Sequence, residues 1–128
     1  MQCGYYTTFQ GKSFLDSLSR PEALFLVAEN EEGTVCGYCG AYMSLFEADI
    51  VNVGVSVPSG GRGTGSALVK ELVERLEEKG IESIFLEVRK SNYPARHVYE
   101  KTGFITIGTR KDFYDDPKED AIIMKRGE

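Results

Sequence analysis

Apolar runs in the first half of the chain predict three consecutive strands joined by short turns. Residues 24–29 and 35–45 are apolar runs of strand length, and the polar turn 30–33 between them predicts a hairpin. After a second turn at 46–49, residues 50–57 alternate in polarity, which predicts a strand with one apolar face. That face is formed by Val51, Val53, Val55 and Val57. Gly54 in mid-strand indicates a bulge or a close approach by another group.

The second half of the chain begins with the clearest helical pattern. Apolar residues repeat at helical spacing from Leu68 to Leu76, and a glycine at position 80 supplies a stop signal. The later patterns predict a strand over 83–88, a short helix over 94–102 and two strands over 104–113 and 121–125. With a short helix over 12–19 at the start, this order predicts an α/β or α+β fold, in which helices flank a mixed sheet.

Length and charge limit the class of protein. A chain of 128 residues is long enough for a single core, so we expect one domain over 1–128. The formal net charge of -5 argues against nucleic-acid binding; it is compatible with a cationic substrate or simply with a well-solvated surface. No apolar run approaches the roughly 18 residues that span a bilayer, and residues 1–10 lack the pattern of a signal peptide. We therefore expect a cytoplasmic protein with no membrane partner.

Cys36 and Cys39 have the CxxC spacing of zinc and redox sites. Both fall within the strand expected over 35–45, where residues three apart point to opposite faces, so the two sulfurs are expected to diverge. A zinc site would also have to recruit Cys3 and the single histidine, His97. We expect free thiols and no metal.

A glycine-rich turn, SGGRGTGS over residues 59–66, joins the strand at 50–57 to the long helix. Glycines let the backbone take shapes closed to other residues and let a ligand approach it. The start of the helix adds unpaired N–H groups and a partial positive charge, and Arg62 adds a full one. The turn therefore predicts an anion site suited to phosphate, with a loop that holds no ligand as the alternative.

The residue pattern of the turn excludes the commoner nucleotide-binding motifs. A Walker loop ends in Gly-Lys-Ser/Thr, whereas Gly65 is followed by Ser66 with no lysine. A dinucleotide fingerprint reads GxGxxG after the first strand of a βαβ unit, whereas Gly61, Gly63 and Gly65 follow three expected antiparallel strands.

The turn, read from Gly60 to Gly65 and placed between a strand and a helix, resembles the pyrophosphate loop of the GNAT superfamily of acyl-CoA-dependent N-acetyltransferases. That loop reads Arg/Gln-x-x-Gly-x-Gly/Ala. Gly63 and Gly65 match its two small positions, but Gly60 stands where Arg or Gln is usual. Because the backbone donors remain, the resemblance implies weaker or differently tuned CoA binding and not its loss.

Two further motifs are more specific than the turn: LEVRKSN at 86–92 and YEKTGF at 99–104, followed by Tyr114 and EDAIIM at 119–124. From about Phe14 to Lys125 the chain resembles the bacterial ribosomal-protein alanine N-acetyltransferases, which acetylate the N-terminal amine of a small-subunit ribosomal protein. The resemblance implies the GNAT fold, acetyl-CoA as cosubstrate and a protein or peptide N-terminus as acceptor.

The resemblance also implies a role for each matching residue. Glu87 takes the place of the general base and Tyr99 that of the general acid, while Asn92 would hydrogen-bond the pantetheine arm. The backbone of Val53, Gly54 and Val55 would pair with that arm like an added strand. The pyrophosphate would be held by Gly60, Gly61, Arg62, Gly63, Thr64, Gly65 and Ser66.

These roles make chemical sense. An attacking amine is protonated at neutral pH and must lose a proton, which suits a carboxylate acting through water. A leaving thiolate can be stabilised by a tyrosine hydroxyl. Taken alone, the same residues have simpler interpretations: Glu87 as a solvated outward residue, Tyr99 as helix-to-sheet packing and Asn92 as a helix cap.

The chain departs from the family at its beginning. Family members start with a strand and a helix ahead of the segment that aligns with residues 8–14, and this chain has no room for them. We therefore expect a GNAT fold that lacks its usual first strand and first helix, either as a truncated form or with a second copy covering the exposed sheet edge.

The sequence thus predicts an N-acetyltransferase that acts on a protein or peptide N-terminal amine by direct transfer in a ternary complex. Acetylation of a small amine, such as a polyamine or an aminosugar, and a CoA-binding module without turnover are the alternatives.

Overall fold

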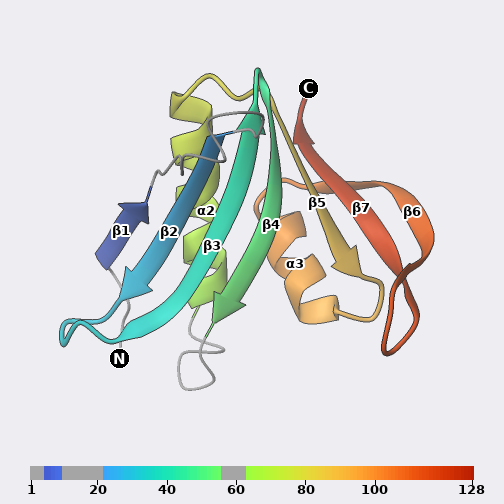
Figure 1. Ribbon diagram of the computed structural model, residues 1–128, viewed down its shortest axis with the longest axis horizontal. Coiled ribbons are helices and arrows are strands. Elements are labelled where there is room, and N and C mark those ends of the chain that lie inside the picture. Colours follow the sequence, from blue (N-terminus) through green and yellow to red (C-terminus); the bar gives the residue numbers. More distant parts are fainter. Residues whose placement is uncertain (1–4, 10–21, 56–62) are drawn as a thin grey trace.

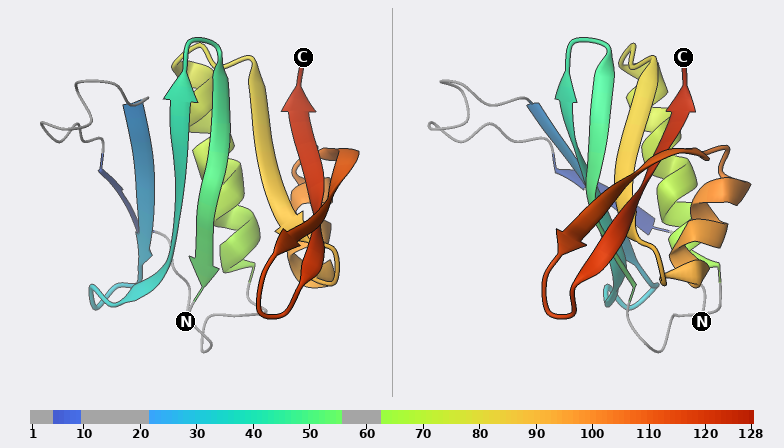
Figure 2. Two further views of the ribbon diagram at one scale, coloured as in Figure 1. Left: turned by 45° about the vertical axis from the view of Figure 1, so that its right-hand side comes forward. Right: turned by 90° about the vertical axis from the view of Figure 1, so that its right-hand side faces the viewer.

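The described strands form one seven-stranded sheet, and the two described helices lie on one of its faces (Figures 1 and 2). The computed structural model describes residues 5–9, 22–55 and 63–128. The strand order is β1-β2-β3-β4-β5-β7-β6, and every neighbouring pair is antiparallel except β4 with β5. The predicted mixed, mostly antiparallel sheet is confirmed.

The strands are β1 (Tyr5–Phe9), β2 (Glu22–Glu29), β3 (Val35–Ser44), β4 (Glu47–Val55), β5 (Ser83–Arg89), β6 (Ile105–Tyr114) and β7 (Glu119–Gly127). The helices are α2 (Thr64–Glu78) and α3 (Tyr93–Lys101). Every element predicted from residue 24 onward is present, with ends that shift by a few residues. The pattern did not reveal β1, which pairs with β2 at the sheet edge. The expectation that no strand precedes β2 is therefore wrong, because β1 covers that edge of β2. The helix expected over 12–19 lies outside the described residues.

α2 supplies the largest apolar face that covers the sheet. Its buried side chains recur at the spacing that predicted the helix, and they pack in one core with residues of β2, β3 and β4. They are Leu68, Val69, Leu72, Val73 and Leu76. The helix starts after Gly63, whose φ of 76° lies in the left-handed region that favours glycine.

β4 carries a bulge that its apolar pattern did not reveal. Gly40 of β3 lies opposite Asn52, and Ala41 lies opposite Ile50, so Val51 is the extra residue on β4. An extra residue shifts the alternation of a strand by one position and moves the following side chains to the other face.

The bulge changes which residues of β4 face the core. Ile50 is 7% exposed, and Val53 and Val55 pack against the same core, whereas Val51 is 43% exposed. The prediction that Val51 shares a face with the later valines is therefore wrong.

Gly54 is explained by a neighbouring ring. A Cβ at this position would lie 2.6 Å from Cε1 of Tyr38, which is the residue opposite it on β3. The predicted close approach is thus made by Tyr38.

The two cysteines of the CxxC pattern have separate environments. Cys39 is a free, fully buried thiol whose Sγ donates to the carbonyl of Leu68 in α2 at 3.6 Å. Cys36 is disulfide-bonded, so the prediction of free thiols is wrong for Cys36. Across the described ranges, no cluster of three or more His, Cys, Asp and Glu side chains could hold a metal ion. Of the helices that the structure describes, neither is long and apolar enough to cross a membrane.

Candidate active site

β4 and β5 part from each other halfway along the sheet. Their parallel pairing ends where Ile50 lies opposite Leu86, although β4 continues to Val55 and β5 to Arg89. β4 remains paired with β3 along this stretch, so only its other edge faces the gap (Figure 1). Alternate residues of a strand direct their N–H and C=O groups to each edge, so residues 51–55 present backbone donors and acceptors to the gap.

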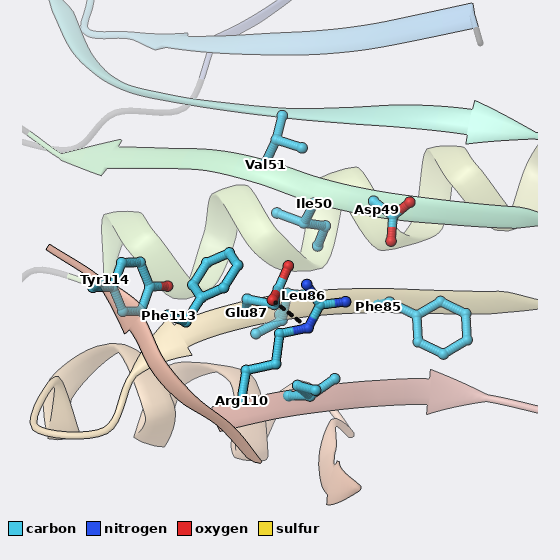
Figure 3. Close-up of a pocket in the computed structure, with 10 residues that line it drawn as sticks. Asp49, Ile50, Val51, Phe85, Leu86, Glu87, Arg110, Phe113 and Tyr114 are labelled. Atoms are coloured by element: carbon cyan, nitrogen blue, oxygen red, sulfur yellow. Dashed lines mark ion pairs between the residues drawn. The ribbon is translucent and has the colours of Figure 1, made fainter. Parts of the chain in front are cut away.

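Glu87 lies on β5 just beyond the last pair of residues. Leu86 and Val88 on either side are buried in the core, and alternation therefore places Glu87 on the face away from α2. Its Oε2 atom lies 3.3 Å from Nε of Arg110, which reaches across from β6 (Figure 3). The two side chains are 34% and 59% exposed, so the ion pair contributes only about 0–1 kcal/mol to stability.

A cavity of about 600 Å³ surrounds Glu87 (Figure 3). Residues of β4, β5, β6 and β7 line it, and they include aromatic and aliphatic side chains and three charged ones. The lining residues are Asp49, Ile50, Val51, Phe85, Leu86, Glu87, Arg110, Phe113, Tyr114 and Ile123.

Tyr99 lies on α3 and is part of the core on the helical face of the sheet, so it is not among the residues that line the cavity. It is 8% exposed and packs edge-on against Phe104, with ring centroids 5.9 Å apart. Burial, and then the nearby Cys39 and Tyr114 side chains, raises the pKa of Tyr99 to about 12. Tyr99 therefore keeps its proton at neutral pH.

Tyr114 links the two candidate catalytic groups. Burial and the charge of Glu87 raise the pKa of the Tyr114 hydroxyl, and Arg89, stacked 4.4 Å from the ring centroid, opposes them. Because Tyr114 also contributes to the raised pKa of Tyr99, Tyr114 lies within electrostatic range of both Glu87 and Tyr99. The carboxylate of β5 and the tyrosine of α3 thus share Tyr114 as a neighbour.

The start of α2 lies beside the free stretch of β4. A Cβ at Gly65 would lie 3.6 Å from the Val55 side chain, and Gly63 at the N-cap has no side chain to cap the helix. No acidic residue stands in the first turn, so nothing there opposes an anion. Thr64 is buried and Ser66 is half-buried. Gly60, Gly61 and Arg62 lie outside the described residues.

Asn92 caps α3. Its Oδ1 atom accepts a hydrogen bond from the backbone N–H of Ala95 at 3.3 Å. The capping interpretation is confirmed, and the side-chain NH₂ group is the part of Asn92 left to meet a ligand.

A second cavity, of about 410 Å³, lies between α2 and α3. Arg126 crosses it and donates to the Thr102 carbonyl at 2.6 Å, and its other nitrogen lies 3.4 Å from the Glu77 carboxylate. Lys70 and Lys101 are the other cationic side chains in its walls.

Sequence reasoning did not single out Asp49, Arg110 or Phe113. Asp49 stands far along the chain from the other two, and only the pairing of β4, β5, β7 and β6 brings it to one cavity with them. Arg110 and Phe113 fall in a predicted strand, which does not distinguish a cavity wall from an ordinary exposed face. Asp49 falls in the turn predicted over 46–49, which is wrong because β4 begins at Glu47.

The chain is similar to acetyltransferases in both sequence and structure. The profile of the acetyltransferase (GNAT) family matches residues 2–104. A Bacillus subtilis protein provisionally named as a ribosomal protein bS18-alanine N-acetyltransferase is 39% identical over 107 residues, which are 84% of this chain and 70% of that protein.

Two solved structures are similar as well. The ribosomal-protein-S18-alanine N-acetyltransferase from Escherichia coli is 33% identical with a TM-score of 0.77, over 82% of this chain and 68% of that one. A nourseothricin acetyltransferase is 27% identical with a TM-score of 0.73, over 82% of this chain and 65% of that one.

Proposed function

The chain belongs to the GNAT family of acetyltransferases, and from that premise we propose that it transfers the acetyl group of acetyl-CoA directly to the N-terminal amine of a protein or peptide. The observation that carries the proposal is the parting of β4 and β5 beside the carboxylate of Glu87. The names of the sequence relative and of the Escherichia coli structure point to a ribosomal protein as the acceptor.

The residues along the parted strands fit acetyl-CoA. The free edge of β4 at Val53, Gly54 and Val55 would pair with the amide groups of the pantetheine arm, as an added strand does. The start of α2, from Gly63 to Ser66, follows directly and would bind the pyrophosphate through backbone N–H groups. Lys70 and Lys101 in the neighbouring cavity are placed to meet a further phosphate.

Glu87 and Tyr99 divide the proton transfers between them. Acetyl-CoA supplies an activated acetyl thioester when it is bound. Glu87 would accept the proton that the acceptor ammonium must lose before its nitrogen can form the new C–N bond. As the C–S bond breaks, Tyr99 would donate its proton to the leaving sulfur, for which its raised pKa keeps it protonated.

Both substrates must be bound at the same time for this transfer, because the proposed mechanism has no step in which a residue of the protein is acetylated. The cavity around Glu87 opens on the face away from α2, so the acceptor would approach from that face while the CoA arm lies along β4. This arrangement supports direct transfer in a ternary complex.

The acceptor is tested by thiol release from acetyl-CoA with a panel of peptides and small amines. We expect release with peptides that carry a free N-terminal amine and none with the same peptides after N-terminal blocking. Release with polyamines or aminosugars alone would point to a small-molecule enzyme. The similar structures are named for different acceptors, a ribosomal protein and nourseothricin, so the fold does not identify the acceptor. The panel of amines tests it directly.

A thermal shift with acetyl-CoA tests the cosubstrate separately. We expect a rise in the unfolding temperature that grows with ligand concentration. Stabilisation without thiol release would indicate a CoA-binding module, and no stabilisation at millimolar acetyl-CoA would contradict the proposal.

A further inference from the structure

Two carboxylates and one guanidinium line the cavity around Glu87. Asp49 comes from β4, Glu87 from β5 and Arg110 from β6, and Figure 3 shows all three along the same cavity. Neither the family resemblance nor the mechanism above gives Asp49 a role.

The charges in the cavity are not balanced. Arg110 is paired with Glu87, whereas no described cation lies within salt-bridge distance of the Asp49 carboxylate. Burial raises the pKa of Asp49, and the like charge of Glu47 raises it further, so both its surroundings and Glu47 favour a cation beside the carboxylate.

The other groups that face Asp49 do not supply that cation. Tyr42 lies opposite it on β3, and Phe85 lies opposite it on β5. Lys125 of β7 is held with its Nζ atom 5.5 Å from the centroid of the Phe85 ring. Tyr114, on the far side of Glu87, is uncharged at neutral pH, as a tyrosine ordinarily is, and its raised pKa keeps it so.

We propose that Asp49 binds the ammonium form of the acceptor amine before Glu87 removes its proton, and so selects acceptors with a charged primary amine. The proposal rests on the acetyl transfer proposed above. An amine is mostly protonated in neutral water, so it brings the positive charge that is absent beside the Asp49 carboxylate. Two charges within about 4 Å at a partly screened site attract each other by up to about 4 kcal/mol before desolvation is counted.

The apolar walls add a second criterion for the acceptor. Phe85, Phe113 and Val51 line the same cavity, and aromatic faces attract cations as well as apolar groups. Together with Asp49, these walls would favour an amine next to a small apolar side chain, such as the N-terminal amine of a peptide that begins with such a residue. They would disfavour an amine at the end of a hydrophilic chain.

The variant Asp49→Asn tests the assignment through steady-state kinetics with an acceptor peptide at saturating acetyl-CoA. We expect KM for the peptide to rise by about 10- to 100-fold, with kcat within about threefold of wild type, because a charge-assisted contact made before the chemical step is lost. Asp49→Glu should recover most of the affinity, since it restores the carboxylate. Glu31→Gln, an exposed site in the turn before β3, is the control for the change in net charge.

The outcomes separate this proposal from the one on which it rests. An unchanged KM in Asp49→Asn, with an active wild-type enzyme, overturns the role of Asp49 and leaves acetyl transfer intact. A collapse of kcat at constant KM also overturns it, because Asp49 would then act in the chemistry. Wild-type protein that releases no thiol with any amine overturns both proposals. The thermal shift with acetyl-CoA serves as the check of folding, and Asp49→Ser is the second variant if Asn is not tolerated.

Discussion

Removing the hydroxyl of Tyr99 is the sharpest perturbation of the proposed chemistry. The variant Tyr99→Phe keeps the ring and its edge-on contact with Phe104 while deleting the proton that the leaving sulfur would receive. With a pKa of about 12, the wild-type hydroxyl is ionised in only about one molecule in 10⁴ at pH 8, so nearly every molecule has the proton in place. A positioned general acid contributes about 10²- to 10⁴-fold to the rate. We expect the single-turnover rate to fall by this factor, which corresponds to roughly 3–5 kcal/mol of transition-state stabilisation.

The stability of this variant should change little. One hydroxyl at an 8% exposed site is worth about 1 kcal/mol or less, so the unfolding midpoint should stay within a few degrees of wild type. Tyr93→Phe is the matched control, because Tyr93 lies on the same helix and is 67% exposed. The assay is single-turnover thiol release with saturating acceptor, which reports the chemical step. A rate for Tyr99→Phe within threefold of the Tyr93→Phe rate would refute the role of Tyr99 as general acid.

Three further predictions follow from the same contacts. Glu87→Gln should lower kcat by about 10²- to 10⁴-fold while acetyl-CoA affinity from calorimetry stays within twofold, with Glu31→Gln as control; unaltered turnover would remove Glu87 from the base role. Burial raises the pKa of Cys39 from 9.0 to about 12, so the folded protein keeps a proton that the unfolded chain loses above pH 9. Stability should therefore fall from pH 9 towards pH 12, by up to about 4 kcal/mol from this thiol, and urea titrations of Cys39→Ala should show a smaller fall. Leu72→Ala, at a fully buried site of α2, should cost about 2–5 kcal/mol in chemical unfolding, whereas Glu74→Ala on the exposed side should cost less than 1.

The elements of the fold were predictable where one face of an element meets the core. The spacing from Leu68 to Leu76 predicted α2 because the helix buries a single stripe against the sheet. The face of β4 was not predictable, because a bulge at Val51 leaves no trace in an alternating pattern of valines. β1 was missed as well, although it pairs along its whole length with β2.

The candidate site was predictable only in part, for a related reason. Glu87 and Tyr99 were found through motifs whose spacing resembles a family, and residue patterns alone would have left them as a surface carboxylate and a packing tyrosine. Asp49 and Arg110 belong to no such motif. They become neighbours only through the order of β4, β5, β7 and β6, which hydrophobic periodicity does not encode.

The most direct test of the central claim is mass spectrometry of an acceptor peptide after incubation with the protein and acetyl-CoA. The peptide should begin with alanine, as the name of the relative suggests, and be compared with the same peptide blocked at its N-terminus. We predict that one acetyl group is added, that fragmentation places it on the terminal nitrogen, and that one thiol is released for each acetylated peptide. A stabilising interaction with acetyl-CoA that leaves every peptide and amine unmodified would contradict the account.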